Sequence, residues 1–363
     1  MPSTWQKAAS DTKKAAQSIL IGIVALILAI GCGCILIVIM GKEPTLAFKA
    51  IYAGSMGSKQ AIGETIVKAA PLLLTAMAFA VTFQCGLLNI GAEGQIYIGG
   101  MAAMCTAQWL EGLPFAIHMP LCVIAAMLFG GIWGALAGWL KVRFNADEMI
   151  TTIMLNYIGN QIANFVVTDI IRDPAGLLPQ SEPAPESARL TQFISGTRIH
   201  IGVIFALLCL VFYYVYLNKM KAGFRTRVVG MNKEAAEYAG INGKKYIVLS
   251  MFIAGMFSGL AGCCELLGLQ GRMLQNFSPG YGFDGIAVAM LGNNSPLGIL
   301  VSAIMFGALK AGSNMMQIMV QVPMATISVV QGLVILVVVG SRFLVAEAER
   351  RSLRKRQEGG SHA

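Results

Sequence analysis

The sequence predicts an all-α protein that crosses a membrane about ten times and consists of two related halves. Of the 363 residues, 56% are hydrophobic and 12% are charged, with a mean hydropathy of +0.68, which is more apolar surface than a soluble core can hide. The apolar residues fall in runs long enough to span a bilayer. A motif of glycines around a carboxylate also occurs twice, at 91–94 (GAEG) and 282–285 (GFDG), each time before an apolar helix.

The charged residues and the cysteines narrow the class of protein. The net charge of +9 comes from basic residues that cluster in particular loops, so it indicates membrane topology and no nucleic-acid partner. The eight cysteines lie in apolar segments without the spacing of metal ligands. We expect them to act as small packing residues, with no bound metal.

The distribution of Lys and Arg divides the chain into spans and loops. We expect a cytoplasmic segment at 1–18, a transmembrane domain at 19–345 and a basic cytoplasmic tail at 346–363. The proline-rich stretch 169–198 is predicted to be external, and 218–245, with seven Lys and Arg, to be a cytoplasmic loop. Ten crossings then place both termini in the cytoplasm. The predicted spans are 19–40, 69–88, 95–110, 119–140, 149–168, 199–217, 246–264, 282–292, one from Pro296 and one from Pro323 to about 341.

The two copies of the carboxylate motif belong to halves of opposite orientation. Span two runs inward and span seven, five spans later, runs outward, so the repeat is inverted. Inverted repeats place broken helices near the middle of the membrane, with their amino ends facing a pathway. Glu93 and Asp284 are therefore candidates for this substrate pathway, because ionisable side chains are costly at that depth. The alternative is that each carboxylate only caps the helix after its glycine turn.

The fifth span, 149–168, carries a polar stripe. Thr152, Asn156, Asn160 and Asn164 are spaced by four residues and share one face of the helix, with Gln161 beside them. Amides facing lipid are costly, so this face is predicted to line a wet pathway of uncharged donors and acceptors. The alternative is hydrogen bonding between neighbouring helices.

The fourth span, 119–140, has a different small-residue pattern. Gly130, Gly134 and Gly138 recur every four residues and therefore lie on one face of the helix. This spacing predicts that the backbone of another helix approaches closely along that face.

A short helix is predicted within the basic loop 218–245. Asn232 is a good amino-terminal cap, Glu234 suits the positive end of the helix dipole, and Gly240 suits the position after the helix. Two turns are not stable alone in water, so this helix must dock on something. It either packs on its own membrane domain or couples the chain to a cytoplasmic partner.

We find no motif for enzymatic chemistry in the sequence. The Gly-Lys pairs at 41–42 and 243–244 lack the rest of a phosphate-binding loop. There is no zinc-protease motif and no nucleophile elbow, and the chain has only three His. We therefore expect no enzyme activity and no cofactor in this chain.

Four motifs give the chain a resemblance to a known family. They are LLNIGAEGQ at 87–95, NADEMITTIMLNYI at 145–158, the Glu-Ala-Ala sequence at 234–236 with Gly240, and SPGYGFDGIAVAMLGNNSPLGIL at 278–300. With these motifs the chain resembles the permease subunits of ATP-binding-cassette (ABC) importers in the branched-chain amino acid, simple sugar and nucleoside group. It is most similar to the bacterial purine nucleoside (guanosine-type) permeases.

This resemblance implies a type II-like ABC importer permease in the bacterial cytoplasmic membrane. It also implies a second, related permease chain, ATPase subunits that bind ATP and Mg²⁺, and an extracytoplasmic substrate-binding lipoprotein. By the same likeness, a coupling helix that contacts the ATPase contains Glu234, Ala235, Ala236 and Gly240.

The side chains of the spans favour a neutral solute. Asparagine amides suit a nucleoside, whereas a carboxylate-bearing solute would call for a buried Lys or Arg in the spans, where Lys310 is the closest case. One alternative is another neutral solute, such as a sugar or a vitamin. A second is a carrier driven by an ion gradient, with Glu93 and Asp284 as ion sites. A third is a membrane scaffold, which would need no asparagine face.

Overall fold

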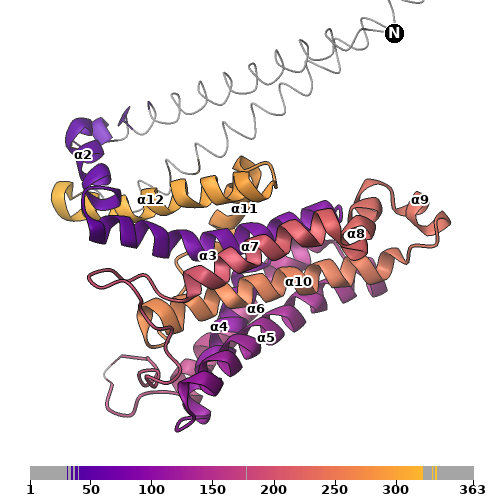
Figure 1. The fold of residues 1–363 in the computed structure, drawn as a ribbon, viewed down its shortest axis with the longest axis horizontal. Coiled ribbons are helices and arrows are strands. Elements are labelled where there is room, and N and C mark those ends of the chain that lie inside the picture. Colours follow the sequence, from indigo (N-terminus) through magenta and orange to yellow (C-terminus); the bar gives the residue numbers. More distant parts are fainter. Residues whose placement is uncertain are drawn as a thin grey trace, which may run out of the picture. The chain divides into compact units, whose positions relative to one another are not determined.

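The structure is a computed structural model that describes residues 41–176 and 178–321, together with positions 31, 34, 35, 37–39, 329 and 332. Most of the predicted first and tenth spans lie outside the described residues. Within the described residues the regular structure is helical, and β-pairing is limited to isolated bridges (Figure 1). The chain divides into two compact units, Ser55–Ala311 and the combination of Met1–Gly54 with Gly312–Ala363.

Four helices form the core of the larger unit. They are α3 (Lys59–Gln84), α4 (Ala92–Trp109), α5 (Phe115–Phe144) and α10 (Gly243–Cys263). α10 packs most extensively against α5 and also contacts α3 and α4 (Figure 1). Most residues of α3 and α10 are buried, so these two helices lie inside the bundle.

Glycines bring α5 and α10 into backbone contact, as the spacing of Gly130, Gly134 and Gly138 predicts. A Cβ atom at any of these three positions would meet the backbone of α10. Two of the α10 residues at this contact, Gly255 and Gly259, are also glycines without side chains. The missing side chains let the two backbones approach closely and gain dispersion contacts.

Further helices of this unit flank the core. In the described residues they are α6 (Glu148–Phe165), α7 (Gly202–Lys219), α8 (Lys221–Met231), α9 (Lys233–Tyr238), α11 (Tyr281–Leu291) and α12 (Pro296–Val320), the last of which also enters the smaller unit. α6 packs against α4, while α7 and α11 pack against α3. α6 and α10 each end in a π-helical turn, η1 (Val166–Ile170) and η2 (Cys264–Gln270).

The smaller unit contains α2 (Pro44–Ser55) and the end of α12. A Cβ atom at Gly312 would meet Ile51, so these two helices pack closely. The buried apolar residues described in this unit are Ile37, Ala47, Ala50, Met316 and Val320.

Several helices extend beyond the predicted spans. α3 begins at Lys59 and not at residue 69, so the helix includes the charged Glu64 and Lys68. α5 continues to Phe144, through half of the predicted loop 141–148, and the loop 218–245 is largely helical. Hydropathy marks only the apolar part of a helix, whereas backbone hydrogen bonding continues through the charged turns at its ends.

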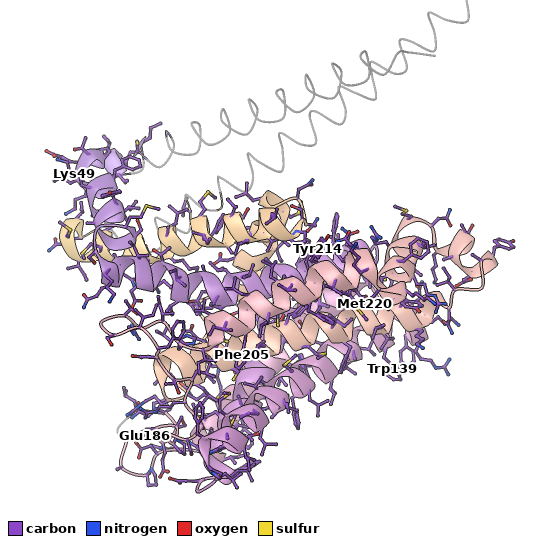
Figure 2. The ribbon with its side chains drawn as sticks, in the orientation of Figure 1. Lys49, Trp139, Glu186, Phe205, Tyr214 and Met220 are labelled. Carbon is purple, nitrogen blue, oxygen red and sulfur yellow. The ribbon has the colours of Figure 1, made fainter. Side chains whose placement is uncertain are left out.

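The exposed faces of the helices are apolar. Within the described residues, five helices are long and apolar enough to cross a membrane. In two of them, α5 and α7, only 28% and 33% of the apolar stretch is buried, and Trp139 and Tyr214 are about half exposed on the outside of the bundle (Figure 2). Apolar surface of this extent needs an apolar surrounding, so the chain is a polytopic membrane protein.

After η1 ends at Ile170, the rest of the predicted external loop forms no helix in its described part, as its prolines predict. It is held on the end of η2 by backbone hydrogen bonds. Leu190 N–H donates to Leu267 O at 3.0 Å, and Ala184 N–H donates to Gly271 O at 2.8 Å. The loop lies at the opposite end of the bundle from α8 and α9 (Figure 1).

Candidate functional site

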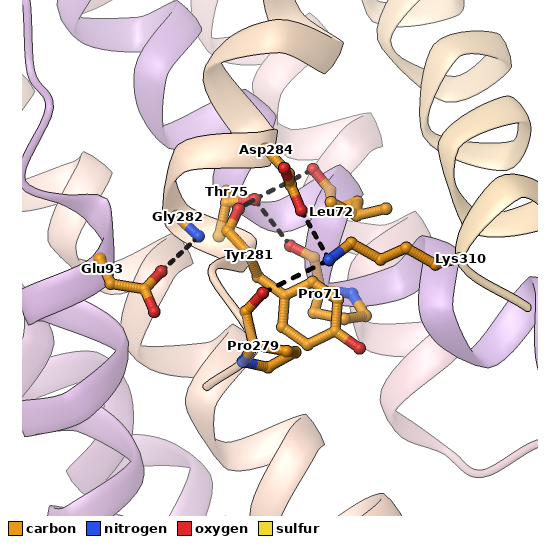
Figure 3. Close-up of polar contacts among 9 residues, drawn as sticks. All are labelled: Pro71, Leu72, Thr75, Glu93, Pro279, Tyr281, Gly282, Asp284 and Lys310. Carbon is orange, nitrogen blue, oxygen red and sulfur yellow. Dashed lines mark hydrogen bonds and ion pairs between the residues drawn. The ribbon is translucent and has the colours of Figure 1, made fainter. Parts of the chain in front are cut away.

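The two carboxylate turns meet inside the larger unit. Glu93, in the first turn of α4, accepts a hydrogen bond from Gly282 N–H in the first turn of α11 at 2.7 Å (Figure 3). Glu93 is only 6% exposed, and a Cβ atom at Gly282 would meet its backbone. A carboxylate at this position satisfies an amide that has no partner in the helix and interacts favourably with the helix dipole. Glu93 therefore caps the helix of the other motif and not its own.

Asp284 forms an ion pair with Lys310 of α12. Lys310 Nζ lies 2.6 Å from Asp284 Oδ2, and the Lys310 and Asp284 side chains are 16% and 22% exposed. The ammonium group also lies over the ring of Tyr281, 4.9 Å from its centroid. Lys310 is partly buried, as the basic residue that came closest to burial in the sequence, and an ion pair makes a lysine tolerable inside an apolar helix.

Thr152 and Asn156 lie on the buried face of α6, against the turn before α4. Asn156 Oδ1 accepts from Gly94 N–H at 2.7 Å, and its Nδ2 donates to Ile90 O at 2.9 Å. Thr152 Oγ1 accepts from Ile90 N–H at 3.3 Å. These two side chains hold the start of α4 in place, which is the helix-to-helix hydrogen bonding considered as the alternative role for the stripe.

Asn160 and Asn164 lie further along α6 and contact Asn276, in the segment between η2 and α11. Asn160 Nδ2 donates to Asn276 Oδ1 at 3.0 Å, and Asn276 N–H donates to Asn164 Oδ1 at 3.1 Å. Gln161 beside them is exposed. Within the described residues, Asn160 Oδ1 has no hydrogen-bond partner. We call Asn160, Gln161, Asn164 and Asn276 the amide cluster.

The predicted stripe is thus divided between two environments, and its partner Asn276 was not predicted. Asn276 follows span seven in a segment without hydrophobic periodicity, so no sequence pattern relates it to α6. Its φ is 52°, a left-handed conformation that asparagine adopts more readily than most residues. Asn-Phe-Ser-Pro-Gly at 276–280 is rich in turn formers, which was the available signal.

Another buried carboxylate, Glu265, was also missed. Span seven is predicted to end at residue 264, which would leave Glu265 at the membrane surface. Instead η2 continues the helix for seven residues, and Glu265 is 6% exposed. Its Oε1 accepts a hydrogen bond from Gln270 Nε2 at 2.8 Å. A π-helical turn has no recognised sequence signature, so hydropathy alone could not place this residue.

The short helix α9 has the predicted caps. Asn232 Oδ1 accepts from Ala235 N–H at 2.9 Å, and Gly240 has a φ of 74°. Ala236 is fully buried against α8 and α10, so one face of α9 docks on its own bundle. Tyr238 is 95% exposed. The other exposed residues at the predicted coupling site are Glu234, Ala235 and Gly240.

In the part of the chain that the structure describes, no three His, Cys, Asp or Glu side chains come together as a metal site. The described cysteines carry free thiols. The arrangement consists of hydrogen-bonding and ion-paired groups at helix breaks, and these groups are suited to polar recognition.

The family model for the permease component of the branched-chain amino acid transport system matches residues 61–339. The chain belongs to this permease family. The matched range contains both carboxylate turns, the amide cluster and α9. The resemblance inferred from the four sequence motifs is therefore confirmed.

Three relatives resemble this permease over most of their length. The guanosine ABC transporter permease protein NupP of Bacillus subtilis is 36% identical, covering 93% of this chain and 99% of the relative. The nucleoside ABC transporter permease protein NupB of Lactococcus lactis is 35% identical, covering 82% and 84%. The glucose ABC transporter permease protein TsgB13 of Haloferax volcanii is 29% identical, covering 88% and 87%. No solved structure matches the permease significantly.

Proposed function

We propose that this chain is a permease subunit of an ATP-driven ABC importer for nucleosides, in particular purine nucleosides such as guanosine. The similarity to a guanosine permease protein over nearly the full length carries this proposal. A second nucleoside relative supports the same substrate class. Another neutral solute, such as a sugar or a vitamin, is the second candidate, because a glucose permease protein is also similar.

In this proposal the chain has ten spans in two inverted halves and lies in the bacterial cytoplasmic membrane with both termini inside. The basic segment that contains α8 and α9 is cytoplasmic by the positive-inside rule. The segment 171–201, at the other end of the bundle, is then external. The contact between the two carboxylate turns supports the inverted halves, since such repeats meet at their broken helices.

The amide cluster lines the substrate pathway. Its side chains offer hydrogen-bond donors and acceptors without net charge, which suits ribose hydroxyls and base edges. Amides facing hydrocarbon would each cost several kcal/mol, so this face of α6 borders a wet pathway shared with a second, related permease chain. Asn160 Oδ1, which has no partner among the described residues, is an acceptor that a solute donor can use after a small shift.

Glu93 and Asp284 act at the breaks that gate this pathway and not as ion sites. Glu93 is engaged by Gly282 N–H and Asp284 by Lys310, so each carboxylate has an internal partner in place of a coupling ion. Thr152 and Asn156 support the first of these breaks from α6. Energy then comes from ATP and Mg²⁺ bound by separate ATPase subunits, and an extracytoplasmic binding lipoprotein delivers the solute.

The coupling helix is α9 with its flanking glycine. Ala236 anchors one face on the bundle, while Glu234, Ala235 and Tyr238 are exposed for contact with an ATPase. Exposed tyrosines are frequent anchors in protein interfaces. A two-turn helix is not stable alone in water, and here α9 would pack on the bundle with one face and on the ATPase with the other.

Uptake of radiolabelled guanosine tests the function. Cells that lack this chain are compared with cells in which it is restored, with unlabelled adenosine, uridine, ribose and riboflavin as competitors. We expect restored uptake that nucleosides block and that stops when the partner ATPase is inactivated. Uptake that does not depend on the chain would refute the nucleoside assignment, and dependence on an ion gradient alone would refute the ABC mechanism.

Copurification of the ATPase tests the coupling helix. Combining Gly240→Val, which strains a backbone with φ of 74°, with Glu234→Lys should abolish copurification while membrane insertion stays normal. Gly196→Val is a matched control, because Gly196 has a φ of 78° in the proposed external loop. Equal loss of copurification in the control would contradict the proposed role of α9.

A further inference from the structure

We propose, on the basis of the import function above, that Glu265 is a positioning residue for the substrate pathway. It holds the segment 271–280, and with it Asn276, against α6 by orienting the side chain of Gln270. Neither Glu265 nor Gln270 belongs to the amide cluster or to the carboxylate turns, and neither has a role in the function described so far.

The segment before α11 has carbonyl groups that its own backbone leaves without partners. Side chains from different helices supply the donors. Gln270 Nε2 donates to Phe277 O at 3.0 Å, and Tyr97 Oη donates to Ser278 O at 3.4 Å. Inside a membrane-spanning bundle such carbonyls must be satisfied by protein groups. The position of the segment is therefore set by the side chains that donate to it.

Two further donors continue the series into α11. Lys310 Nζ donates to Pro279 O at 3.5 Å, and Thr75 Oγ1 donates to Tyr281 O at 3.0 Å (Figure 3). Lys310 is itself oriented by Asp284, its ion-pair partner. Each of the two flexible donors, Lys310 and Gln270, thus has a carboxylate that fixes it.

Glu265 orients the side chain of Gln270 in the same way that Asp284 orients Lys310. Glu265 Oε1 lies 2.8 Å from Gln270 Nε2, the same nitrogen that donates to Phe277 O. Both amide hydrogens of Gln270 are thereby used, one on Glu265 and one on the residue next to Asn276. Glu265 is 6% exposed, and a buried carboxylate is tolerated where it is hydrogen-bonded, which the amide of Gln270 provides here.

The surroundings of Glu265 keep it in place. The carboxylate interacts electrostatically with Lys68 of α3 and also with Tyr281 at the start of α11. Gln270 also lines an outer cavity of about 490 Å³ between the loop residues 183–192 and the end of η2. The Glu265–Gln270 pair therefore lies between the outer cavity, the segment 271–280 and Tyr281 in the first turn of α11.

Cross-linking tests the positioning directly. Asn160 and Asn276 are each replaced by cysteine, and the purified importer is treated with dibromobimane, which fluoresces when it joins two nearby thiols. The chain with its native cysteines, but without the two introduced ones, gives the background. We expect efficient cross-linking, strong loss when Glu265→Leu is added, and retention with Glu265→Gln, whose amide oxygen still accepts from Gln270.

Transport kinetics provide the second measurement, with the native asparagines present. We expect Glu265→Leu to raise the KM for guanosine about tenfold, as the loss of one directed hydrogen bond allows, with little change in maximal rate. Glu265→Gln should keep a near-normal KM. Glu64→Leu is the matched control, since Glu64 is an acid near the outer end of α3 that pairs with Arg198, and none of the described hydrogen bonds joins Glu64 to Gln270 or to the segment 271–280.

Each outcome decides the role of Glu265. Unchanged cross-linking together with an unchanged KM in Glu265→Leu would overturn it, and so would equal effects of Glu64→Leu. If Glu265→Leu does not accumulate in the membrane, Gln270→Leu breaks the same pair and is measured instead. If the unaltered chain imports no nucleoside, the proposed function fails, while the cross-linking yields still decide whether Glu265 positions Asn276.

Discussion

We predict that substitutions of Asp284 and Lys310, which form an ion pair, have strongly coupled effects on the free energy of unfolding. The two charges are 2.6 Å apart, and only about a fifth of each side chain is exposed. Removing one partner of a fully buried pair costs about 3–5 kcal/mol, whereas an exposed pair contributes about 0–1 kcal/mol. For this partly exposed pair we therefore expect Lys310→Met to lower the free energy of unfolding by ~3 kcal/mol and Asp284→Asn by ~2 kcal/mol.

The double variant should lose less than the sum of the single variants. With both charges gone, neither group is left buried without its partner, so we expect a loss of ~2 kcal/mol and a coupling energy of ~3 kcal/mol. The assay is unfolding of the purified chain in mixed detergent micelles with increasing SDS, followed by tryptophan fluorescence. Additivity of the two changes within about 0.5 kcal/mol would refute the coupling.

The ion pair between Arg198 and Glu64 provides a matched control. It is longer, at 3.4 Å, and its side chains are 53% and 27% exposed. The same double-mutant cycle with Arg198→Met and Glu64→Gln should give a coupling energy below about 1 kcal/mol. Equal coupling in the two cycles would mean that burial does not determine the strength of these pairs.

Three further predictions concern packing, capping and the pathway. Gly134→Leu should prevent accumulation of folded chain, because its side chain would collide with α10, whereas Gly243→Ala, which meets only ordinary contacts, should accumulate normally on an immunoblot. Asn232→Ala should destabilise α9 by about 1 kcal/mol and weaken ATPase copurification, which Asn232→Ser should preserve. Asn160→Leu should raise the KM for guanosine about tenfold, while Asn218→Leu, which alters an exposed asparagine of α7, should leave uptake kinetics unchanged.

The sequence predicts the parts of the fold that depend on local patterns. Gly130, Gly134 and Gly138 lie on one face of any helix, so their contact with another backbone follows from spacing alone. Asn232 and Gly240 are recognisable because a helix cap depends on a few neighbouring residues. The ends of the spans are less predictable, since hydropathy changes before the helix ends.

The contacts at the candidate site are mostly long-range, and the sequence does not specify them. Glu93 and Gly282 are 189 positions apart, so the motif predicts a capping carboxylate but not which helix it caps. Lys310 was identified as the basic residue closest to being buried, yet its partner Asp284 was assigned to the pathway separately. Asn276 and Glu265 were missed because a turn and a π-helical end separate them from any periodic pattern.

The glycine contact between α5 and α10 also has a mechanical consequence. Interlocked backbones cannot slide past each other, because a shift of one residue would place the side chain of Trp133 where Gly134 now meets α10. These two helices therefore act as one rigid frame. In an importer that alternates between open states, we expect α5 and α10 to move together as one body. A few glycines thus couple the movement of two helices that are far apart in the sequence.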